Sequence, residues 1–518
     1  MSTLATTRHH PRLALATLSL VLFLTFLDNT IVSVVLADVQ QTLHAGVGAL
    51  QWVVNGYALV FASLMLTMGT LGDLFGRKRV MLAGVVVFCA GSILCALAPN
   101  VQTLIAGRAI MGIGAAASEP GTLSMIRHMY PDRRNRAQAL GVWAAVSGLA
   151  LSLGPVIGGT LDGLWSWRAI FWFNLFFGVL AYVGASYALP ENADPQNKRL
   201  DVPGFVLGAV ALAAGSFAVI SGETAGYGSW YIAVLFGLGL AATVGFLGYE
   251  RRAPNPVLDV RYFRIAPFSG SNFVAFSTYF STFSLFFFVA LYLQVVGSHS
   301  SYGTAVEFVP MAFGMVVAGV VTGRVVAASG PRLPMAVGCA LAAVGCLLTE
   351  ARLSPTAGLV QIGWTMAIAG IGFGMAIVPV TSSALAVIPK EHSGMAASMT
   401  NTSREMGAVA GVAVLGSIVN GQLTVDLIHK LAQIGIPKFI REAVVTAVTT
   451  GTFNAQTAKA LGGSQNLTAI VDKILPPAYG ALTNGLDIAL YISGALMALS
   501  AVLAVVTMRV PRGTQLEV

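Results

Sequence analysis

One carboxylate lies deep inside the first apolar stretch of the chain, and its position points to proton chemistry. Residues 13–35 are long enough to cross a bilayer, and Asp28 lies roughly 12 Å from the outer end of that span. An ionised carboxylate at that depth costs on the order of 3 kcal/mol or more, so such groups usually face water or a partner inside a helix bundle. Because the neutral acid is cheaper to bury than the charged one, Asp28 is a candidate to bind and release a proton.

Two charged residues in a second apolar stretch, 102–125, are suited to act with Asp28. Arg108 lies roughly 10 Å deep, so the two opposite charges are expected to pair and Arg108 to control when Asp28 ionises. A static structural ion pair is the alternative. Glu119 follows eleven residues later on nearly the same face. It either lines an inner cavity, where it carries a proton or selects a substrate, or meets cytoplasmic water.

The composition excludes a soluble globular protein. The 518 residues have a mean hydropathy of +0.78 and 10% charged residues, whereas about 25% is usual for soluble domains. The net charge of +8 comes from basic residues in short loops, which indicates membrane topology rather than a nucleic-acid partner. The four cysteines lie inside apolar runs, so we expect small buried side chains and neither disulfides nor a metal site.

Hydropathy predicts an all-α integral membrane protein with fourteen transmembrane helices. Every second connection is basic, which places both termini in the cytoplasm. Apolar residues in the long outer connection, 421–481, indicate short amphipathic helices over the outer mouth or a poorly ordered insertion. The predicted spans are 13–35, 50–71, 80–98, 102–125, 138–161, 169–189, 202–221, 230–249, 268–294, 303–327, 333–350, 359–386, 395–420 and 482–507.

The connection after the second span reads GTLGDLFGRKRVML, beginning at Gly69. It resembles the loop signature of the major facilitator superfamily. The resemblance implies that this loop holds the cytoplasmic side closed in one state, and that Asp73 pairs with Arg77 or meets the positive end of another helix. The residues of this predicted cytoplasmic gate are Gly69, Asp73, Gly76, Arg77 and Lys78.

Further motifs make the resemblance more specific. LIAGRAIMGIGAA, which contains Arg108, fits the superfamily, and GLALSLGPVIGG resembles the motif of its antiporter branch. The glycines of the latter predict close packing with a bend at the proline. LDNTIVSVVLA, around Asp28, resembles the fourteen-span drug:proton antiporters, although Ser33 and Ala37 replace the usual Asn and Pro. The antiporter motif residues are Gly154, Pro155, Gly158 and Gly159.

The span 395–420 adds a second membrane acid, Glu405, in a segment that also resembles the antiporters. In that group an acid at this position occurs in exporters of cationic drugs, but a further acid that they often carry one turn earlier is replaced here by Asn401. We expect Arg404 to neutralise Glu405. Structural pairing and proton or substrate binding both remain open for Glu405.

The resemblance implies two six-helix bundles, 13–190 and 265–507, joined by a linker with two extra helices, 191–264, and flanked by cytoplasmic tails, 1–12 and 508–518. A substrate site is expected between the bundles near mid-membrane. Polar and soft side chains in several spans are candidates to line it. They are Trp52, Tyr57, Asn272, Tyr292, Gln294, Met375 and Asn401.

The expected function is export of a hydrophobic drug or antibiotic across a bacterial plasma membrane in exchange for protons. Asp28, Arg108, Glu119 and Glu405 are the candidates for proton coupling, and the proton gradient replaces any cofactor. The expected partners are a small hydrophobic substrate, protons and the lipid bilayer, with the protein acting as a monomer and binding no nucleic acid. Export of one endogenous metabolite, or a sensor role, are alternatives. No catalytic motif favours an enzyme.

Overall fold

The chain is a bundle of long helices. The computed structural model describes residues 11–130, 132–191, 201–253, 260–354, 356–388, 393–433 and 465–508, and every regular element within these ranges is helical. Thirteen helices in the described ranges are long and apolar enough to cross a membrane. The remaining predicted span, 138–161, lies in α6, a helix of 32 residues that packs beside α1 and α11.

The first six-helix bundle begins with a helix that changes its geometry near the outer end. There α1 passes into a short 3-10 segment, η1, and then into α2. We name this the outer end, after the orientation that the loop charges predict. The elements are α1 (Pro11–Ile31), η1 (Val32–Val35), α2 (Leu36–Leu43), α3 (Val47–Phe75), α4 (Arg77–Ala96), α5 (Val101–Met129), α6 (Arg133–Leu164) and α7 (Ala169–Ala188).

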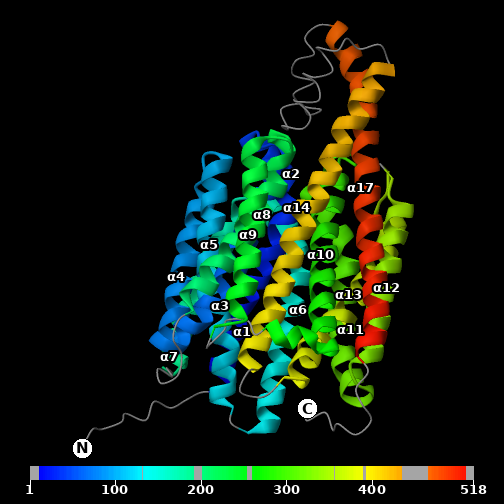
Figure 1. The fold of residues 1–518 in the computed structure, drawn as a ribbon. Helices are drawn as coiled ribbons and strands as arrows, with labels where there is room; N and C mark the ends of the chain where they lie inside the picture. Colours follow the sequence, from blue (N-terminus) through cyan, green and yellow to red (C-terminus); the bar gives the residue numbers. More distant parts are fainter. Residues whose placement is uncertain are drawn as a thin grey trace, which may run out of the picture.

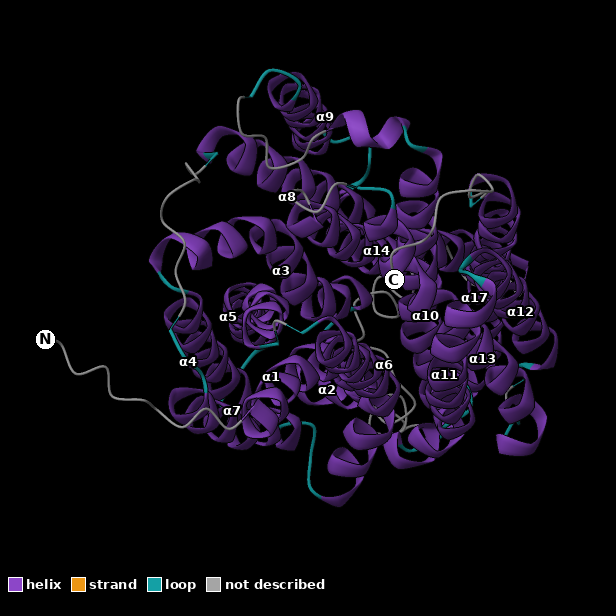
Figure 2. Ribbon diagram, turned by 90° about the horizontal axis from the view of Figure 1, so that it is seen from below, coloured by secondary structure: helices purple, strands orange, loops and turns teal. Residues whose placement is uncertain are grey.

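A second set of helices repeats the arrangement, and two linker helices lie at its edge. Seen from below, α8 lies between α9 and the pair α3 and α14 (Figure 2), and the packing agrees, because α8 contacts all three. The linker helices are α8 (Val202–Ala225) and α9 (Trp230–Glu250), followed by η2 (Val260–Arg264). The second bundle contains α10 (Ala266–Val295), α11 (Ser301–Ser329), α12 (Arg332–Arg352), α13 (Leu359–Ala386), α14 (Ser393–Gln433) and α17 (Gln465–Thr507).

Two helices of the second bundle are longer than the hydropathy predicts. With 41 residues α14 is about 60 Å long, twice the roughly 30 Å of a bilayer core, and α17 has 43 residues. They extend together beyond the other helices (Figure 1). The sequence predicts short amphipathic helices or a poorly ordered insertion in the outer connection, but its first residues continue α14 as far as Gln433. Residues 434–464 of the predicted outer connection lie outside the described residues.

The two bundles meet at the outer end. The Ser301 hydroxyl at the start of α11 donates to the Asp38 carboxylate at 2.8 Å, and the Gln294 amide donates to the Val34 carbonyl. Along the same edge α6 packs against α11. These contacts close the outer side between the bundles.

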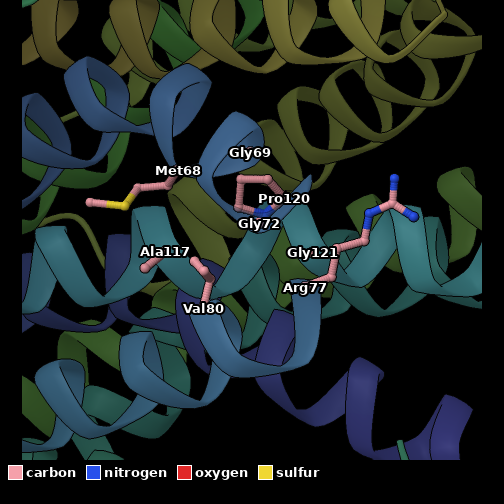
Figure 3. A pocket seen from close by; sticks show the side chains of 8 residues that line it. All are labelled: Met68, Gly69, Gly72, Arg77, Val80, Ala117, Pro120 and Gly121. Atoms are coloured by element: carbon pink, nitrogen blue, oxygen red, sulfur yellow. The ribbon is translucent and has the colours of Figure 1, made fainter. Parts of the chain in front are cut away.

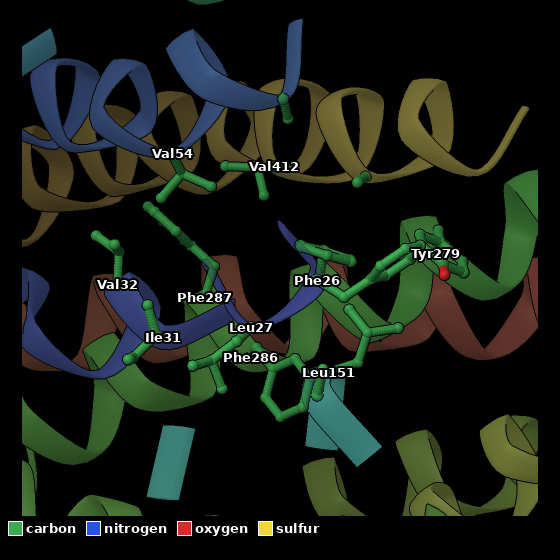
Figure 4. Close-up of a cluster of buried hydrophobic side chains, with 14 of the residues drawn as sticks. Phe26, Leu27, Ile31, Val32, Val54, Leu151, Tyr279, Phe286, Phe287 and Val412 are labelled. Carbon is green, nitrogen blue, oxygen red and sulfur yellow. The ribbon is translucent and has the colours of Figure 1, made fainter. Parts of the chain in front are cut away.

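Apolar side chains fill the centre of the interface. Phe26, Leu27 and Ile31 of α1 lie beside Phe286 and Phe287 of α10 (Figure 4). All five are at most 2% exposed. A polar or charged group in this layer therefore has no access to bulk water unless the bundles move, which is the setting in which the membrane acids must be considered.

Candidate functional site: two polar clusters in the membrane

The predicted contact between Asp28 and Arg108 is present. The guanidinium donates to one Asp28 oxygen, and the Asn174 amide of α7 donates to the other at 2.7 Å. Asp28 and Arg108 are both fully buried. We name Asp28, Arg108 and Asn174 the Asp28 cluster. Its formal charges cancel, and charge-assisted hydrogen bonds of this kind are among the strongest in proteins.

The backbone of α3 holds Arg108 in place. Its Nε donates to the Val53 carbonyl at 2.9 Å, and its guanidinium carbon lies 4.5 Å from the centre of the Tyr57 ring. The Tyr57 hydroxyl donates to the Thr25 carbonyl of α1 at 3.0 Å. A change in the charge of Asp28 would therefore be transmitted through Arg108 to α3, since one guanidinium binds both.

The glycines of GLALSLGPVIGG bring α6 against two helices at once. A methyl group added at Gly154 or Gly158 would collide with Thr30 or with the Ile31 carbonyl of α1. One added at Gly159 would lie 2.4 Å from the Ser301 carbonyl of α11. The motif therefore fixes the helix that carries Asp28 on one side and the outer contact between the bundles on the other, with Pro155 inside α6.

A second polar group of residues crosses between the bundles nearer the inner end. The Asn401 amide of α14 reaches the Glu119 carboxylate of α5 at 3.4 Å, and the Asn401 carbonyl oxygen accepts from Arg404 at 3.0 Å. Glu405 lies close enough to Glu119 for their like charges to repel. We name Glu119, Asn401, Arg404 and Glu405 the inner cluster. Both acids are 2% exposed, and each has one oxygen without a hydrogen-bond partner among the described residues.

Arg404 is expected to neutralise Glu405, but its hydrogen bonds in the described part of the chain go to other residues. Arg404 binds Asn401, donates to the Thr381 hydroxyl at 2.6 Å and lies 5.7 Å from the centre of the Tyr279 ring. The physical reason is helical geometry, because adjacent residues on a helix point about 100° apart and do not face each other. Arg404 still attracts Glu405 electrostatically, without a bond to it.

The predicted gate loop is tied to its own bundle. The Lys78 ammonium donates to the Ser186 and Leu189 carbonyls at the end of α7, each at 2.7 Å, and Arg79 pairs with Glu191 at 3.5 Å. Gly76 adopts a φ of +106°, a backbone conformation that residues other than glycine rarely adopt. Gly69, Gly72 and Arg77 line a small pocket with Pro120 and Gly121 of α5 (Figure 3). The side chain of Asp73 lies outside the described residues, so its predicted pairing stays a prediction.

Comparison with known proteins identifies the family. Residues 18–412 match the sequence profile of the Major Facilitator Superfamily. The chain belongs to the major facilitator superfamily. The fourteen predicted spans and the motifs around Asp28 and in α6 place it with the fourteen-span drug:proton antiporters of that superfamily.

Curated relatives within the superfamily include antibiotic resistance proteins. The methylenomycin A resistance protein of Bacillus subtilis (strain 168) is 35% identical over 406 residues, which cover 78% of this chain and 87% of the relative. The drug efflux pump JefA of Mycobacterium tuberculosis (strain ATCC 25618 / H37Rv) is 29% identical over 512 residues. These residues cover 97% of this chain and 98% of the relative.

Solved structures support the fold. A bacterial homologue of the human lysosomal transporter Spinster, in an inward-facing and unoccupied conformation, matches with a TM-score of 0.62 at 16% identity. The match covers 96% of this chain and 98% of that one. It shows that this chain has the same helical fold as that protein.

Within this superfamily fold, the predicted cavity residues are dispersed. Gln294 takes part in the outer contact, and Asn401 belongs to the inner cluster. Tyr57 supports Arg108, while Met375 of α13 lies against Gly338 of α12, inside the second bundle. Met375 therefore packs inside the second bundle, and Tyr57 packs against Arg108.

The other three predicted cavity residues belong to α10 and α3. The Asn272 carbonyl oxygen accepts from the Ser403 hydroxyl at 3.0 Å, which ties α10 to α14. Tyr292 is 1% exposed. The ring of Trp52 packs against Phe217 of linker helix α8, with 5.1 Å between the ring centres.

Sequence reasoning missed three amide side chains in this transporter. Asn174 binds Asp28, and Gln51 and Asn55 of α3 are fully buried. An uncharged amide gives a weak signal in an apolar run, because burying it costs less than burying a charge. The available signal was depth, since Asn55 lies about 12 Å along α3 from its outer start, near the level of Asp28.

Proposed function

We propose that this protein exports hydrophobic drugs or antibiotics across a bacterial plasma membrane in exchange for protons. The buried Asp28 cluster is the observation that carries the proposal, because it pairs a titratable acid with an arginine that also binds the backbone of α3. The resistance and efflux names of the relatives support the choice of substrate class.

The proton coupling would operate through competition for Asp28. When the carboxylate is charged, Arg108 and Asn174 bind its two oxygens. A proton entering from outside neutralises the carboxylate and weakens its attraction for the guanidinium. The neutral acid can then be enclosed in the apolar interface while the bundles rock, and the proton leaves toward the cytoplasm.

The inner cluster supplies a second place for a positive charge. The cluster combines Glu119 of the first bundle with Glu405 and Arg404 of the second, so it carries an excess negative charge when both acids are ionised. A proton or the positive group of a cationic drug would balance that charge. Both bind best when the bundles are positioned as they are here, because Glu119 and Glu405 come from different bundles.

The expected orientation follows from the loop charges. Both termini lie in the cytoplasm, and the basic loop from Gly69 to Lys78 acts as the cytoplasmic gate. The protein is expected to act as a monomer, with protons and a small hydrophobic compound as its ligands and no cofactor other than the proton gradient.

Transport in proteoliposomes tests the proposal. With a proton gradient imposed, the wild-type protein should move a drug against its concentration gradient, and collapsing the gradient with an ionophore should stop this movement. An Asp28→Asn variant that folds but still accumulates drug against its gradient would reject the assignment of Asp28. The control is Glu350→Gln, which should transport normally. The Glu350 carboxylate lies on an exposed face of α12, where it accepts a hydrogen bond from the Tyr491 hydroxyl at 2.9 Å.

A further inference from the structure

Two amide side chains on α3, those of Gln51 and Asn55, are fully buried. Gln51 and Asn55 are both 0% exposed, and neither the oxygen nor the nitrogen of either amide has a hydrogen-bond partner among the described residues. Buried polar groups are nearly always hydrogen-bonded, and leaving one unpaired is destabilising. Two neighbouring amides in this condition therefore call for an explanation outside the resting contacts of the chain.

The two amides share one face of α3, and that face looks toward the other bundle. Residues four apart on a helix lie on the same side, so Asn55 follows Gln51 by one turn. The Gln51 amide lies against Gly416 of α14, where an added methyl group would come within 2.2 Å of its nitrogen. Val54 of α3 and Val412 of α14 lie in the same buried cluster (Figure 4).

The opposite face of α3 belongs to the Asp28 cluster. Arg108 binds the Val53 carbonyl and stacks on Tyr57, and Gly112 of α5 lies against the backbone at Tyr57. The segment 51–57 thus has one side held by the proton-binding pair and the other facing the bundle interface. A shift of Arg108 would move the two amides with it.

The chemistry of the amides defines what they could recognise. Each offers one acceptor oxygen and an NH2 donor, and neither carries a charge. The charges of Asp28 and Arg108, on the far side of α3, cancel each other. The matching ligand group is neutral and hydrogen-bonding, such as a carbonyl, hydroxyl or amide on an otherwise apolar compound.

We propose that Gln51 and Asn55 form an amide clamp that binds a neutral hydrogen-bonding group of the exported compound. The inference rests on the proposed function and adds that neutral and positively charged groups of substrates bind at different places. The clamp takes neutral polar groups in the outer half, whereas the inner cluster takes positive charge. Because Arg108 holds the same segment of α3, the clamp is also the point at which proton binding at Asp28 reaches the substrate.

Two probes and two variants test the clamp. Chloramphenicol is neutral and carries hydroxyl and amide groups, and tetraphenylphosphonium is a cation with no hydrogen-bonding group. Gln51→Met and Asn55→Leu remove the amides while keeping the shape. Each should raise the KM for chloramphenicol roughly three- to tenfold, the value of one lost hydrogen bond, and leave the KM for tetraphenylphosphonium within about twofold.

A stability measurement separates the clamp from a structural role. If the amides serve the substrate, replacing them with apolar side chains should leave the melting temperature of the drug-free protein unchanged or raise it. The control is Ser63→Ala, which removes a buried hydroxyl group further along α3 instead of an amide. It should leave both KM values unchanged.

The outcomes are distinguishable. A lower melting temperature in both variants, or an equal loss of transport for the two probes, overturns the clamp. Wild-type transport of chloramphenicol with an unchanged KM in both variants also overturns it while leaving the proposed function intact. A wild-type protein that transports neither probe contradicts the proposed function itself, and the clamp with it.

Discussion

The Asp28 cluster and the inner cluster differ in charge balance and in what they connect. The first lies within one bundle, pairs one acid with one arginine, and binds both oxygens of the carboxylate. The second joins two bundles, sets two acids against one arginine, and leaves an oxygen of each acid without a partner among the described residues. An acid paired with one arginine inside one bundle is suited to change its protonation state during transport. A group with unbalanced charge between two bundles is suited to bind a ligand.

Removing the acid of the balanced cluster should have the largest effect. Asp28→Asn leaves Arg108 as a buried charge without its partner, which is expected to cost about 3–5 kcal/mol of stability and to abolish coupled transport. The measurement is the melting temperature together with drug uptake into proteoliposomes. The double variant Asp28→Asn with Arg108→Gln removes the unpaired charge, so it should recover stability but not transport. Recovery of transport in the double variant would mean that the pair is only structural.

Disturbing the packing of α1, the helix that carries Asp28, should have the second-largest effect. In Gly158→Ala the added methyl group would lie 2.3 Å from the Ile31 carbonyl, a clash expected to cost about 1–3 kcal/mol. We expect a lower melting temperature and weaker coupling of drug flux to proton flux. Gly148→Ala, on the same helix with no atom within 4 Å of the added group, is the matched control and should resemble the wild type. Equal effects of the two substitutions would refute the packing role of the motif.

The helices and the central pair could be predicted from sequence, for simple physical reasons. Apolar runs of about 20 residues mark the spans, and two opposite charges at similar depth, Asp28 and Arg108, find each other because neither tolerates lipid alone. The lengths of α14 and α17 could not be predicted, since a helix that leaves the membrane loses its apolar signature without ending.

The partners of the clusters were harder to predict because they depend on helix rotation. Asn174 lies 146 residues from Asp28 in the sequence, and its amide carries no charge that would mark it. Arg404 and Glu405 are adjacent in sequence but point in different directions, so adjacency did not reveal that Arg404 binds Asn401 and Thr381. The depth of a residue can be counted along a span, whereas the face on which it lies relative to other helices comes only from packing.

Neutralising one acid of the inner cluster should alter substrate choice more than coupling. Glu119→Gln removes the excess negative charge, so the KM for tetraphenylphosphonium should rise about tenfold or more, the value of a contact with a charged group. The KM for chloramphenicol should change little. Transport kinetics of the two probes in proteoliposomes measure the difference. An equal loss for both would indicate that the two clusters act as one proton path and would remove the distinction drawn between them.

The smallest effect is expected at the outer contact, which belongs to neither cluster. Ser301→Ala removes the hydrogen bond to Asp38 across the bundles, worth about 0.5–1.5 kcal/mol. We expect more frequent outer opening, visible as faster labelling of a cysteine introduced at Gln294. Ser329→Ala, whose hydroxyl bonds only its own helix at Val325 among the described residues, is the control and should not change the labelling rate.

Drug-induced proton release from the purified protein tests the role of Asp28 most directly. A drug is added to weakly buffered wild-type protein and to the double variant Asp28→Asn with Arg108→Gln, and released protons are counted with a pH indicator. If drug binding shifts Asp28 to its charged form, which Arg108 and Asn174 bind, the drug should release protons from the wild type but not from the variant. Equal release from both proteins, or none from a wild-type protein that binds the drug, would contradict the assignment of Asp28 as the coupling acid.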